Sequence, residues 1–452
     1  MMKADKISPV FDLVFTDEKS HERREAIVLY RPPPVAARVR GRMKVLQERL
    51  HHVRRLAEAQ TGARDHILAD YNKMSAAHFQ GERPGSSSPI GTGALPISRM
   101  EVTPAILAEL SENPAVLAIL PNQAVHLISP QRVSFRELSE KEQKDGLTWG
   151  LSLLEIPKLW ETTKGEEIRV AVIDTGVHQN HSVLARRVSE FVVIDPSGTR
   201  INASPSFDAG QHGTHVCGTI AGGETDKGVA VGVAPMGNLF VAAVLLGNAT
   251  IVGLLEAISW AVEQGADIIN LSLGLHHYEP LFEKVFATLL EEYSVLPVVS
   301  IGNAHHGNTT SPGNIASVLS VGALENRGDT GIDVAFFSSG ASFVFPNVER
   351  DALVTKPDIV APGAQIFSCI PPELCDDGKH YYCYMDGTSM AAPHVAGVAA
   401  LLMAASPTVE ARTVFDVLRE TASHPQGHDH RPDNRWGYGV ISPGEALKAL
   451  KS

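Results

Sequence analysis

Two patterns of hydrophobic and polar positions divide the chain near residue 147. After this point, short apolar runs alternate with helical segments, and the runs lie at residues 168–173, 238–244, 267–273, 295–300 and 318–321. Residues 251–262 form a helical pattern between two of these runs. Apolar strands that alternate with helices are typical of a parallel sheet with helices on both faces. We therefore predict an α/β domain over residues 147–452.

The chain before residue 130 has shorter elements in a different order. Strand-like runs lie at residues 25–30, 95–102, 115–120 and 124–128. An apolar stripe at spacings of four and three predicts a helix, and its members are Val39, Met43, Leu46, Leu50 and Val53. A second, short helix is opened by Thr103-Pro104. This order predicts a separate α+β domain over residues 1–130.

Two polar segments and a basic helix face complete this pattern. Residues 81–93 are a loop by composition, and the polar residues 131–146 have little to bury and are interpreted as a linker. The predicted long helix carries cations on its other face, and these are Arg38, Arg40, Arg42, Lys44, Arg49, Arg54 and Arg55. Such a face could contact an acidic partner, but a solvated face of an amphipathic helix is the favoured interpretation.

Composition narrows the class of protein. The chain has 452 residues, of which 44% are hydrophobic and 20% charged, which is ordinary for a globular protein with a large core. Its net charge of −12 argues against nucleic-acid binding by the whole chain. No apolar run looks long enough to span a bilayer, no signal peptide is visible, and four cysteines do not indicate a disulfide scaffold. We therefore expect a cytoplasmic protein without a nucleic-acid or membrane partner.

Four chemically distinctive residues stand at the ends of the predicted elements. Asp174 and Asn303 follow apolar strands, and ligands of parallel sheets bind outside the carboxyl ends of strands. His212 opens a segment of small residues that is expected to be helical. Ser389 lies between a Gly-Thr turn and a small-residue helix that contains Pro393. At a helix N-terminus, negative charge that develops on a reacting group is stabilised.

Each of these residues taken alone has a simpler structural explanation. Asp174 and Asn303 would serve as turn formers, and Ser389 as an ordinary helix cap. His212 and His215 could form a metal pair, but they lack the spacing of four with an intervening glutamate that helical zinc sites use. A general base that takes a proton from a serine fits the position of His212 better.

The order of these residues along the chain resembles that of the subtilisin-like serine proteases, or subtilases. The matching motifs are Val172-Ile173-Asp174-Thr175-Gly176, His212-Gly213-Thr214-His215-Val216, Gly302-Asn303 and Gly387-Thr388-Ser389-Met390-Ala391-Ala392-Pro393. The resemblance covers about residues 147–450. It implies a serine endopeptidase with a three-layer, parallel-sheet α/β catalytic domain, preceded by a small α+β (ferredoxin-like) prodomain that inhibits it.

The resemblance also implies a role for each residue. Ser389 would attack the scissile carbonyl, and His212 would take its proton and later protonate the leaving amine. Asp174 would orient the imidazole, and Asn303 would stabilise the oxyanion. The substrate backbone would pair with Ser272, Leu273 and Gly274, next to Gly302. The implied partners are protein or peptide substrates and the chain's own prodomain.

The resemblance also leads to expectations about substrate preference and processing. Residues 304–311, which should form the floor of the pocket for the residue before the scissile bond, contain no carboxylate. This favours apolar over basic residues in that pocket. We expect the polar segment after residue 128 to lie along the strand at Ser272 to Gly274 and to be cut at Gln143 or Lys144.

Departures from the family pattern bear on metals and activity. Residues 180–184 lack the acid that many extracellular subtilases use for calcium, so no cofactor is expected to be required and calcium stays open. Glu224 and Asp226 are interpreted as part of a solvated loop. Zinc at the cysteines near His380 is conceivable, but unpaired thiols are favoured at Cys369, Cys375 and Cys383. A catalytically silent pseudoprotease and a metal-dependent hydrolase stay as alternatives.

Overall fold

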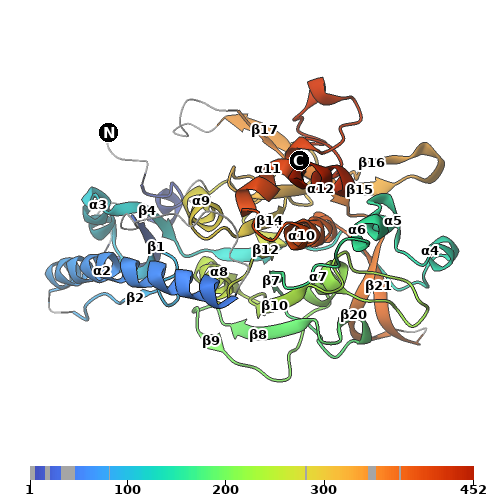
Figure 1. The fold of residues 1–452 in the computed structure, drawn as a ribbon. Helices are drawn as coiled ribbons and strands as arrows, with labels where there is room; N and C mark the ends of the chain where they lie inside the picture. The colour runs from blue at the N-terminus through green and yellow to red at the C-terminus, as the bar shows by residue number, and fades with distance from the viewer. Residues whose placement is uncertain are drawn as a thin grey trace.

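A computed structural model describes the chain in two regions that lie against each other (Figure 1). The described residues are 6–15, 21–31, 46–80, 82–279, 282–344, 353–375 and 378–451. The first region is a small antiparallel sheet with helices, and the second is built on a mainly parallel sheet. Both parts of the predicted fold class are therefore confirmed.

The N-terminal region has the strand and helix order of a ferredoxin-like fold. Its sheet has the order β2-β3-β1-β4, and every pair is antiparallel. The elements in chain order are α1 (Phe11–Val14), β1 (Arg24–Tyr30), α2 (Leu46–His78), β2 (Ser87–Pro89), β3 (Ile97–Val102), α3 (Pro104–Glu112) and β4 (Val116–Pro121). Helix α3 begins as predicted, because the side chain of Thr103 accepts a hydrogen bond from the N–H of Ile106.

One expectation for this region was wrong. Residues 81–93 were expected to be a loop, but Ser87–Pro89 form the edge strand β2, paired with β3. Ile90, which follows, is 1% exposed. Serines, proline and glycines gave the segment a loop composition, and only pairing with β3, the next strand along the chain, makes it extended.

The larger region has three layers, and β7 shows how they are arranged. Alternate residues of a strand point to opposite faces of the sheet. Val170 and Val172 belong to one core cluster with α7 and α10, whereas Ala171 and Ile173 belong to another with α8 and α9. The helices are α7 (His212–Ala221), α8 (Ile251–Glu263), α9 (Phe282–Glu292) and α10 (Thr388–Ala405), and α11 (Ala411–Glu420) and α12 (Pro443–Lys451) lie near α10.

The strands of this sheet are parallel except at its edges. Their order is β16-β15-β14-β12-β7-β10-β8-β9, and β19 also pairs with β15. Their bounds are β7 (Arg169–Asp174), β8 (Val188–Ile194), β9 (Arg200–Ile201), β10 (Asn238–Ala243), β12 (Ile268–Leu271), β14 (Leu296–Ser300), β15 (Leu319–Asn326), β16 (Ile332–Val334) and β19 (Ile359–Pro362). Parallel strands bring their carboxyl ends to one edge, where the distinctive residues of the sequence were expected to meet.

Helix α10 contradicts the expectation that no apolar run is long enough to span a bilayer. With 18 residues and a mean hydropathy of 1.4, it is long and apolar enough to cross a membrane by length and composition alone. In the structure 89% of this stretch is buried inside the protein. We therefore interpret α10 as the central core helix of the larger region.

Small sheets lie outside the two main ones; the sheet that contains β5 joins the two regions, and the sheet that contains β6 includes part of residues 131–146. One has the order β11-β5-β13 and another β20-β21-β6, and β17 pairs with β18. Their strands are β5 (Ala124–Leu127), β6 (Arg132–Ser134), β11 (Ala249–Thr250), β13 (Leu273–Gly274), β17 (Ala341–Val344), β18 (Leu353–Lys356), β20 (Ile366–Cys375) and β21 (Gly378–Asp386). Residues 131–146 are therefore not the unburied linker that was expected, since they contain β6, helix α4 (Glu140–Asp145) and a buried Leu138.

Helix α2 lies next to α8 across the boundary between the two regions (Figure 1). Val53 and Leu56 of α2 share a hydrophobic cluster with residues of α8 and α9. All residues of α8 from Ile251 to Val262 are buried. The apolar stripe predicted for this helix thus packs partly against the larger region, although Val39 and Met43 lie outside the described residues.

Arg49 on α2 overturns part of the solvated-face interpretation. Its side chain is 5% exposed, and Nη1 lies 3.2 Å from Oδ1 of Asp267. Nη2 donates to the carbonyl oxygen of Ala266, just beyond the C-terminal end of α8, where a positive charge is favoured. Arg54 and Arg55 are exposed as expected. The remaining cations of the predicted basic face, Arg38, Arg40, Arg42 and Lys44, lie outside the described residues.

We expect Arg49→Ala to lower the free energy of unfolding by about 1.5–3 kcal/mol, the usual contribution of hydrogen bonds to charged groups. Asp267 keeps Arg169 as a partner, with Nε 3.0 Å from Oδ2, so its charge stays paired. Urea denaturation in a Ser389→Ala background, which removes the expected nucleophile, measures the change. The exposed Arg54→Ala on the same helix is the control and should change stability by less than about 0.5 kcal/mol. Equal effects of the two variants would contradict the anchoring role of Arg49.

Candidate active site

Asp174 and His212 meet at the carboxyl edge of the main sheet. Asp174 ends β7, His212 begins α7, and their side chains are 0% and 4% exposed. The Nδ1 atom of His212 lies 2.8 Å from Oδ1 and 3.0 Å from Oδ2 of Asp174. A carboxylate at Nδ1 keeps the proton on that nitrogen, so Nε2 carries the lone pair. Within the part of the chain that the structure describes, this buried Nε2 has no hydrogen-bond partner and can accept a proton.

Two residues that the sequence analysis did not single out hold the start of α7. The hydroxyl of Thr175 accepts from the N–H of Gly213 at 2.9 Å and donates to Asp208 at 2.6 Å. The other carboxylate oxygen of Asp208 accepts from the N–H and the hydroxyl of Thr214, at 2.8 and 2.6 Å. A carboxylate at a helix N-terminus is stabilised by the helix dipole. The sequence feature that could have pointed to Asp208 is an acidic residue shortly before a helix of small residues.

Two glycines allow the close backbone contacts of the site. A Cβ atom on Gly213 would lie 2.1 Å from the carbonyl oxygen of Gly176, in the loop after β7. A Cβ atom on Gly274 would lie 2.2 Å from the carbonyl oxygen of Ser311. Any side chain at these two positions would displace α7 or β13 from its neighbour.

Ser389 and Asn303 face a segment of the chain that crosses the site. The hydroxyl of Ser389, in the first turn of α10, donates to the carbonyl oxygen of Ile128 at 2.8 Å. Oδ1 of Asn303 accepts from the N–H and the hydroxyl of Thr388, both at 2.9 Å. These bonds orient the amide so that its Nδ2 donates to the carbonyl oxygen of Ser129 at 2.9 Å. Two consecutive peptide carbonyls thus lie against the two side chains.

The crossing segment is held as a strand between two others. β5 pairs antiparallel with β13, with Leu127 opposite Leu273, and with β11 along its other edge. The N–H of Ile128 continues this ladder and donates to the carbonyl oxygen of Ser272 at 3.0 Å. Ser272, Leu273 and Gly274 therefore lie next to a bound peptide segment. Their contact with substrates stays a prediction, as does that of Gly302, whose N–H donates to the hydroxyl of Thr388 at 3.3 Å.

The identity of the bound segment differs from the expectation. The polar residues after 128 were expected to lie along β13 and to be cut at Gln143 or Lys144. The structure places both of these residues in α4, whose first turn is capped by the side chain of Ser139. Residues in a helix cannot pair with β13 as a strand. Instead β5, the last strand of the N-terminal region, pairs with β13. The side chain of Ile128 is buried there, with the residue 7% exposed.

The second histidine of the motif has a separate position. Nε2 of His215 lies 3.0 Å from the carbonyl oxygen of Ile366, and burial lowers the pKa of His215 to about 3. His212 and His215 thus engage different partners, and His215 stays neutral at ordinary pH. Across the described ranges, no group of three or more His, Cys, Asp or Glu side chains is arranged to hold a metal ion. The metal-dependent hydrolase has no supporting geometry in this part of the chain.

Buried thiols lie behind α7. Cys217, Cys369 and Cys383 are free and 0% exposed, and Sγ of Cys369 donates to the carbonyl oxygen of Thr214 at 3.5 Å. Burial raises the pKa of Cys369 to about 12, so this thiol stays protonated and unreactive. We interpret these cysteines as core residues, and for Cys369 and Cys383 this agrees with the unpaired thiols that the sequence favoured.

Comparison with known proteins establishes the family. The family model described as "Subtilase family" matches residues 165–439, so the chain belongs to the subtilase family. An intracellular serine protease of Paenibacillus polymyxa is 33% identical over 60% of this chain and 77% of its own length. Subtilisin E of Bacillus subtilis (strain 168) is 33% identical over 63% of this chain and 68% of its own length.

Fervidolysin of Fervidobacterium pennivorans matches a longer part of the chain. It is 32% identical over 73% of this chain and 48% of its own length, so the chain spans about half of that relative. The crystal structure of fervidolysin, described as a keratinolytic enzyme related to subtilisin, superposes with a TM-score of 0.68 at 24% identity. The superposition covers 98% of this chain and 62% of that one, which shows the shared fold. The region before the residues that the family model matches is consistent with a prodomain. The cytoplasmic location and the domain boundaries stay predictions.

We expect EDTA to change the melting temperature by less than about 2 °C, which for a chain of 452 residues is at most about 2 kcal/mol of stability. At the position considered for calcium, Val183 is 4% exposed and its carbonyl oxygen already accepts from the N–H of Gly223 at 2.8 Å. Thermal melts of the Ser389→Ala chain with and without EDTA make the measurement. A fall of several degrees that calcium reverses would reveal a binding site outside these residues.

Proposed function

We propose that this chain is a serine endopeptidase made as a self-inhibited precursor, with Asp174, His212 and Ser389 as its catalytic triad. One observation carries the proposal. The hydroxyl of Ser389 lies 2.8 Å from the carbonyl oxygen of a peptide bound as a strand, and the Asp174–His212 pair lies at the same edge of the sheet. The family assignment supports the same chemistry.

Each side chain has one task in this mechanism. Ser389 rotates about its Cα–Cβ bond and donates its proton to Nε2 of His212 as Oγ attacks the carbonyl carbon. Asp174, buried against Nδ1, stabilises the imidazolium that forms. His212 then passes the proton to the leaving amine, and a water molecule repeats the sequence to hydrolyse the acyl-enzyme.

Asn303 stabilises the oxyanion together with the N–H of Ser389 at the start of α10. Thr388 fixes the amide orientation of Asn303 before reaction, so the donor costs little reorganisation when charge develops. In the resting chain Nδ2 bonds to the oxygen of Ser129, one peptide beyond Ile128. We assign Ile128–Ser129 as the scissile bond because the nucleophile contacts the Ile128 carbonyl. The buried isoleucine also fits the expected preference for apolar residues at this position.

Self-inhibition follows from how the N-terminal region holds the larger one. β5 fills the strand position between β11 and β13 that a substrate would need. The carbonyl oxygen of Gln123 and Oδ1 of Asn122 accept from the first N–H groups of α8, at 2.9 and 3.1 Å. Arg49 contacts the carbonyl of Ala266 just beyond the other end of the same helix. The N-terminal region thus binds both ends of α8 as well as its buried face, so β5 is held in the site.

We expect the purified chain to cut itself after Ile128, and Ser389→Ala or His212→Ala to abolish the cut. Either change should lower kcat of the processed enzyme on peptides by a factor on the order of 10⁶, as in subtilisin. Mass spectrometry of the wild-type chain next to Ser389→Ala locates the cut. A new N-terminus at Ser129 supports the assignment, and one at Pro130, Lys144 or Asp145 would move it. Equal self-cleavage by Ser389→Ala, free of other proteases, would refute the triad.

We expect Asn303→Ala to lower kcat by about 10²–10³-fold with little change in KM, because its amide acts mainly on the developing oxyanion. Steady-state kinetics of the processed enzyme on a peptide amide measure both constants. Asn238→Ala is a matched control, since Asn238 begins β10 at the amino edge of the sheet, opposite the edge that carries the site. A rise in KM at constant kcat would make Asn303 a binding residue instead.

The pseudoprotease alternative rests on one observation. In the resting chain the hydroxyl of Ser389 donates to Ile128 and not to His212. A fluorophosphonate probe labels only an activated serine, so labelling of the processed chain excludes a silent protein. An absence of labelling after removal of the N-terminal region would favour a peptide-binding role.

A further inference from the structure

We propose that β6 stays paired with β21 after the Ile128–Ser129 bond is cut, in the path of the substrate residues that follow the scissile bond. This inference rests on the proposed function. It makes β6 a second inhibitory segment that acts independently of the N-terminal region.

The chain continues along the larger region after it leaves Ser389. The N–H of Gln131 donates to the carbonyl oxygen of Asp386 at 2.7 Å. β6 then pairs antiparallel with β21, placing Arg132 opposite Asp386, Val133 opposite Met385 and Ser134 opposite Tyr384. Asp386 lies three residues before Ser389, so the strand that binds β6 leads directly to the nucleophile. A peptide that extends beyond the scissile bond reaches the same strand edge.

Further contacts hold the segment after β6. The guanidinium carbon of Arg136 lies 4.4 Å from the ring centroid of Tyr384, and Arg136 donates to Oε1 of Gln365. The N–H of Ser139 donates to the hydroxyl oxygen of Tyr384 at 3.0 Å, and that hydroxyl donates to Oε2 of Glu142 at 2.6 Å. Glu142 is 5% exposed although it is an acid. These contacts anchor the segment at its far end.

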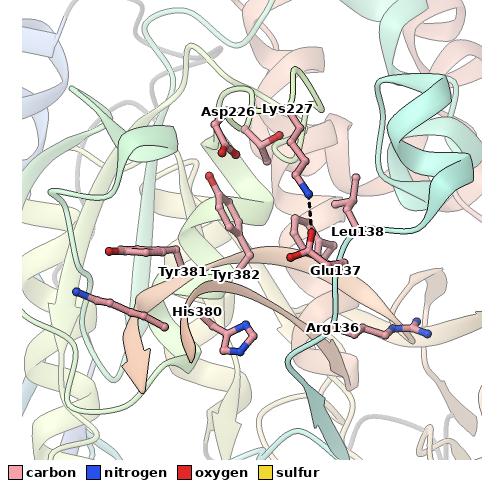
Figure 2. Close-up of a pocket in the computed structure, with 11 residues that line it drawn as sticks. Arg136, Glu137, Leu138, Asp226, Lys227, His380, Tyr381 and Tyr382 are labelled. Carbon is pink, nitrogen blue, oxygen red and sulfur yellow. Dashed lines mark hydrogen bonds and ion pairs between the residues drawn. The ribbon is translucent and has the colours of Figure 1, made fainter. Parts of the chain in front are cut away.

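Figure 2 shows the residues that line a hollow on the other side of this segment. A hollow of about 180 Å³ lies between Arg136 to Leu138, the hairpin of β20 and β21, and the loop with Asp226 and Lys227. An ion pair between Lys227 and Glu137 at 2.5 Å crosses it, but both side chains are largely exposed, so the pair contributes little. The contacts of Arg136 and Glu142 with the hairpin add to the ladder between β6 and β21, so single substitutions at these two residues should weaken the hold.

These contacts do not depend on the N-terminal region. The partners named for β6, Arg136, Ser139 and Glu142 belong to β21, apart from Gln365, which lies just before β20. β5, by contrast, is continuous with the N-terminal region and leaves with it. Hydrolysis consumes one water, leaves a carboxylate on Ile128 and a free amine on Ser129, and breaks none of the contacts after residue 130.

The retained segment has two consequences for the reaction. The amine of Ser129 stays near the acyl-enzyme, where its attack on the ester between Ile128 and Ser389 re-forms the peptide bond and frees the hydroxyl. Cutting therefore becomes irreversible only when water has hydrolysed the ester and residues up to 128 have left. The processed enzyme then has an open site before the scissile bond and an occupied site after it.

The test compares two substrates on the processed enzyme after the N-terminal region has been removed. One is a peptide anilide that ends at the leaving group, and the other is an internally quenched peptide that extends eight residues beyond the scissile bond. In Arg136→Ala and Glu142→Gln, kcat/KM for the long peptide should rise at least about fivefold, as loss of a contact worth about 1 kcal/mol implies. Anilide turnover should stay within twofold. The exposed Lys141→Ala on α4 is the matched control and should change neither rate.

Hydrogen exchange of residues 131–136 provides a readout besides activity. Protection that persists after residues up to 128 have left supports a retained β6, and its loss on cutting would overturn the proposal. Equal gains for both substrates in Arg136→Ala, or no gain for the long peptide in either variant, would also overturn it. Titration with a fluorophosphonate separates these outcomes from failure of the proposed function, because an enzyme without an active serine is not labelled at all.

Discussion

The antiparallel ladder that holds β5 between β11 and β13 determines how the two regions of the chain relate to the site. A strand bound on both edges cannot slip by one residue without moving every side chain to the opposite face, so its register is fixed. Val125 shares a core cluster with residues of α8, while the carbonyl of Ile128, three residues on, reaches Ser389. The position of a single peptide bond thus depends on the packing of an entire region. The same ladder connects the sheet of the N-terminal region, through β4 and β5, to the edge of the larger sheet.

The site itself depends on where parallel strands end. Asp174 is fixed by its position at the end of β7, and α7 approaches it closely because Gly213 has no side chain. Thr175 and Asp208 then fix the first turn of α7 through its N–H groups. Each of these contacts is short in range, yet together they hold a buried imidazole nitrogen of His212 that has no hydrogen-bond partner among the described residues. The contacts around His212 are close, whereas near Arg136 a hollow remains between the segment and the surface that it covers.

Much of the fold could be predicted because local sequence patterns determine it. The apolar run at residues 168–173 became β7, Thr103-Pro104 opened α3, and the residues at strand ends came together at one edge. Two of the errors occur where the partner is distant in sequence. β6 is polar and forms a strand only because β21, some 250 residues later, offers an edge. Arg49 resembled a solvated cation because its carboxylate and carbonyl partners, at Asp267 and Ala266, lie in the other region. The sequence showed which residues carry the chemistry, but it did not show which segment of the chain would lie across them.

The shared apolar cluster of α2, α8 and α9 has a thermodynamic consequence for the release of the N-terminal region. Separation of the two regions would hydrate the buried face of α8 together with Val53 and Leu56. Exposure of apolar surface raises the heat capacity, and hydrophobic attraction weakens on cooling. The affinity between the two regions must therefore curve with temperature and pass through a maximum, instead of rising steadily in the cold. Temperature thus acts on the duration of inhibition through water structure at this interface, without any change at the triad.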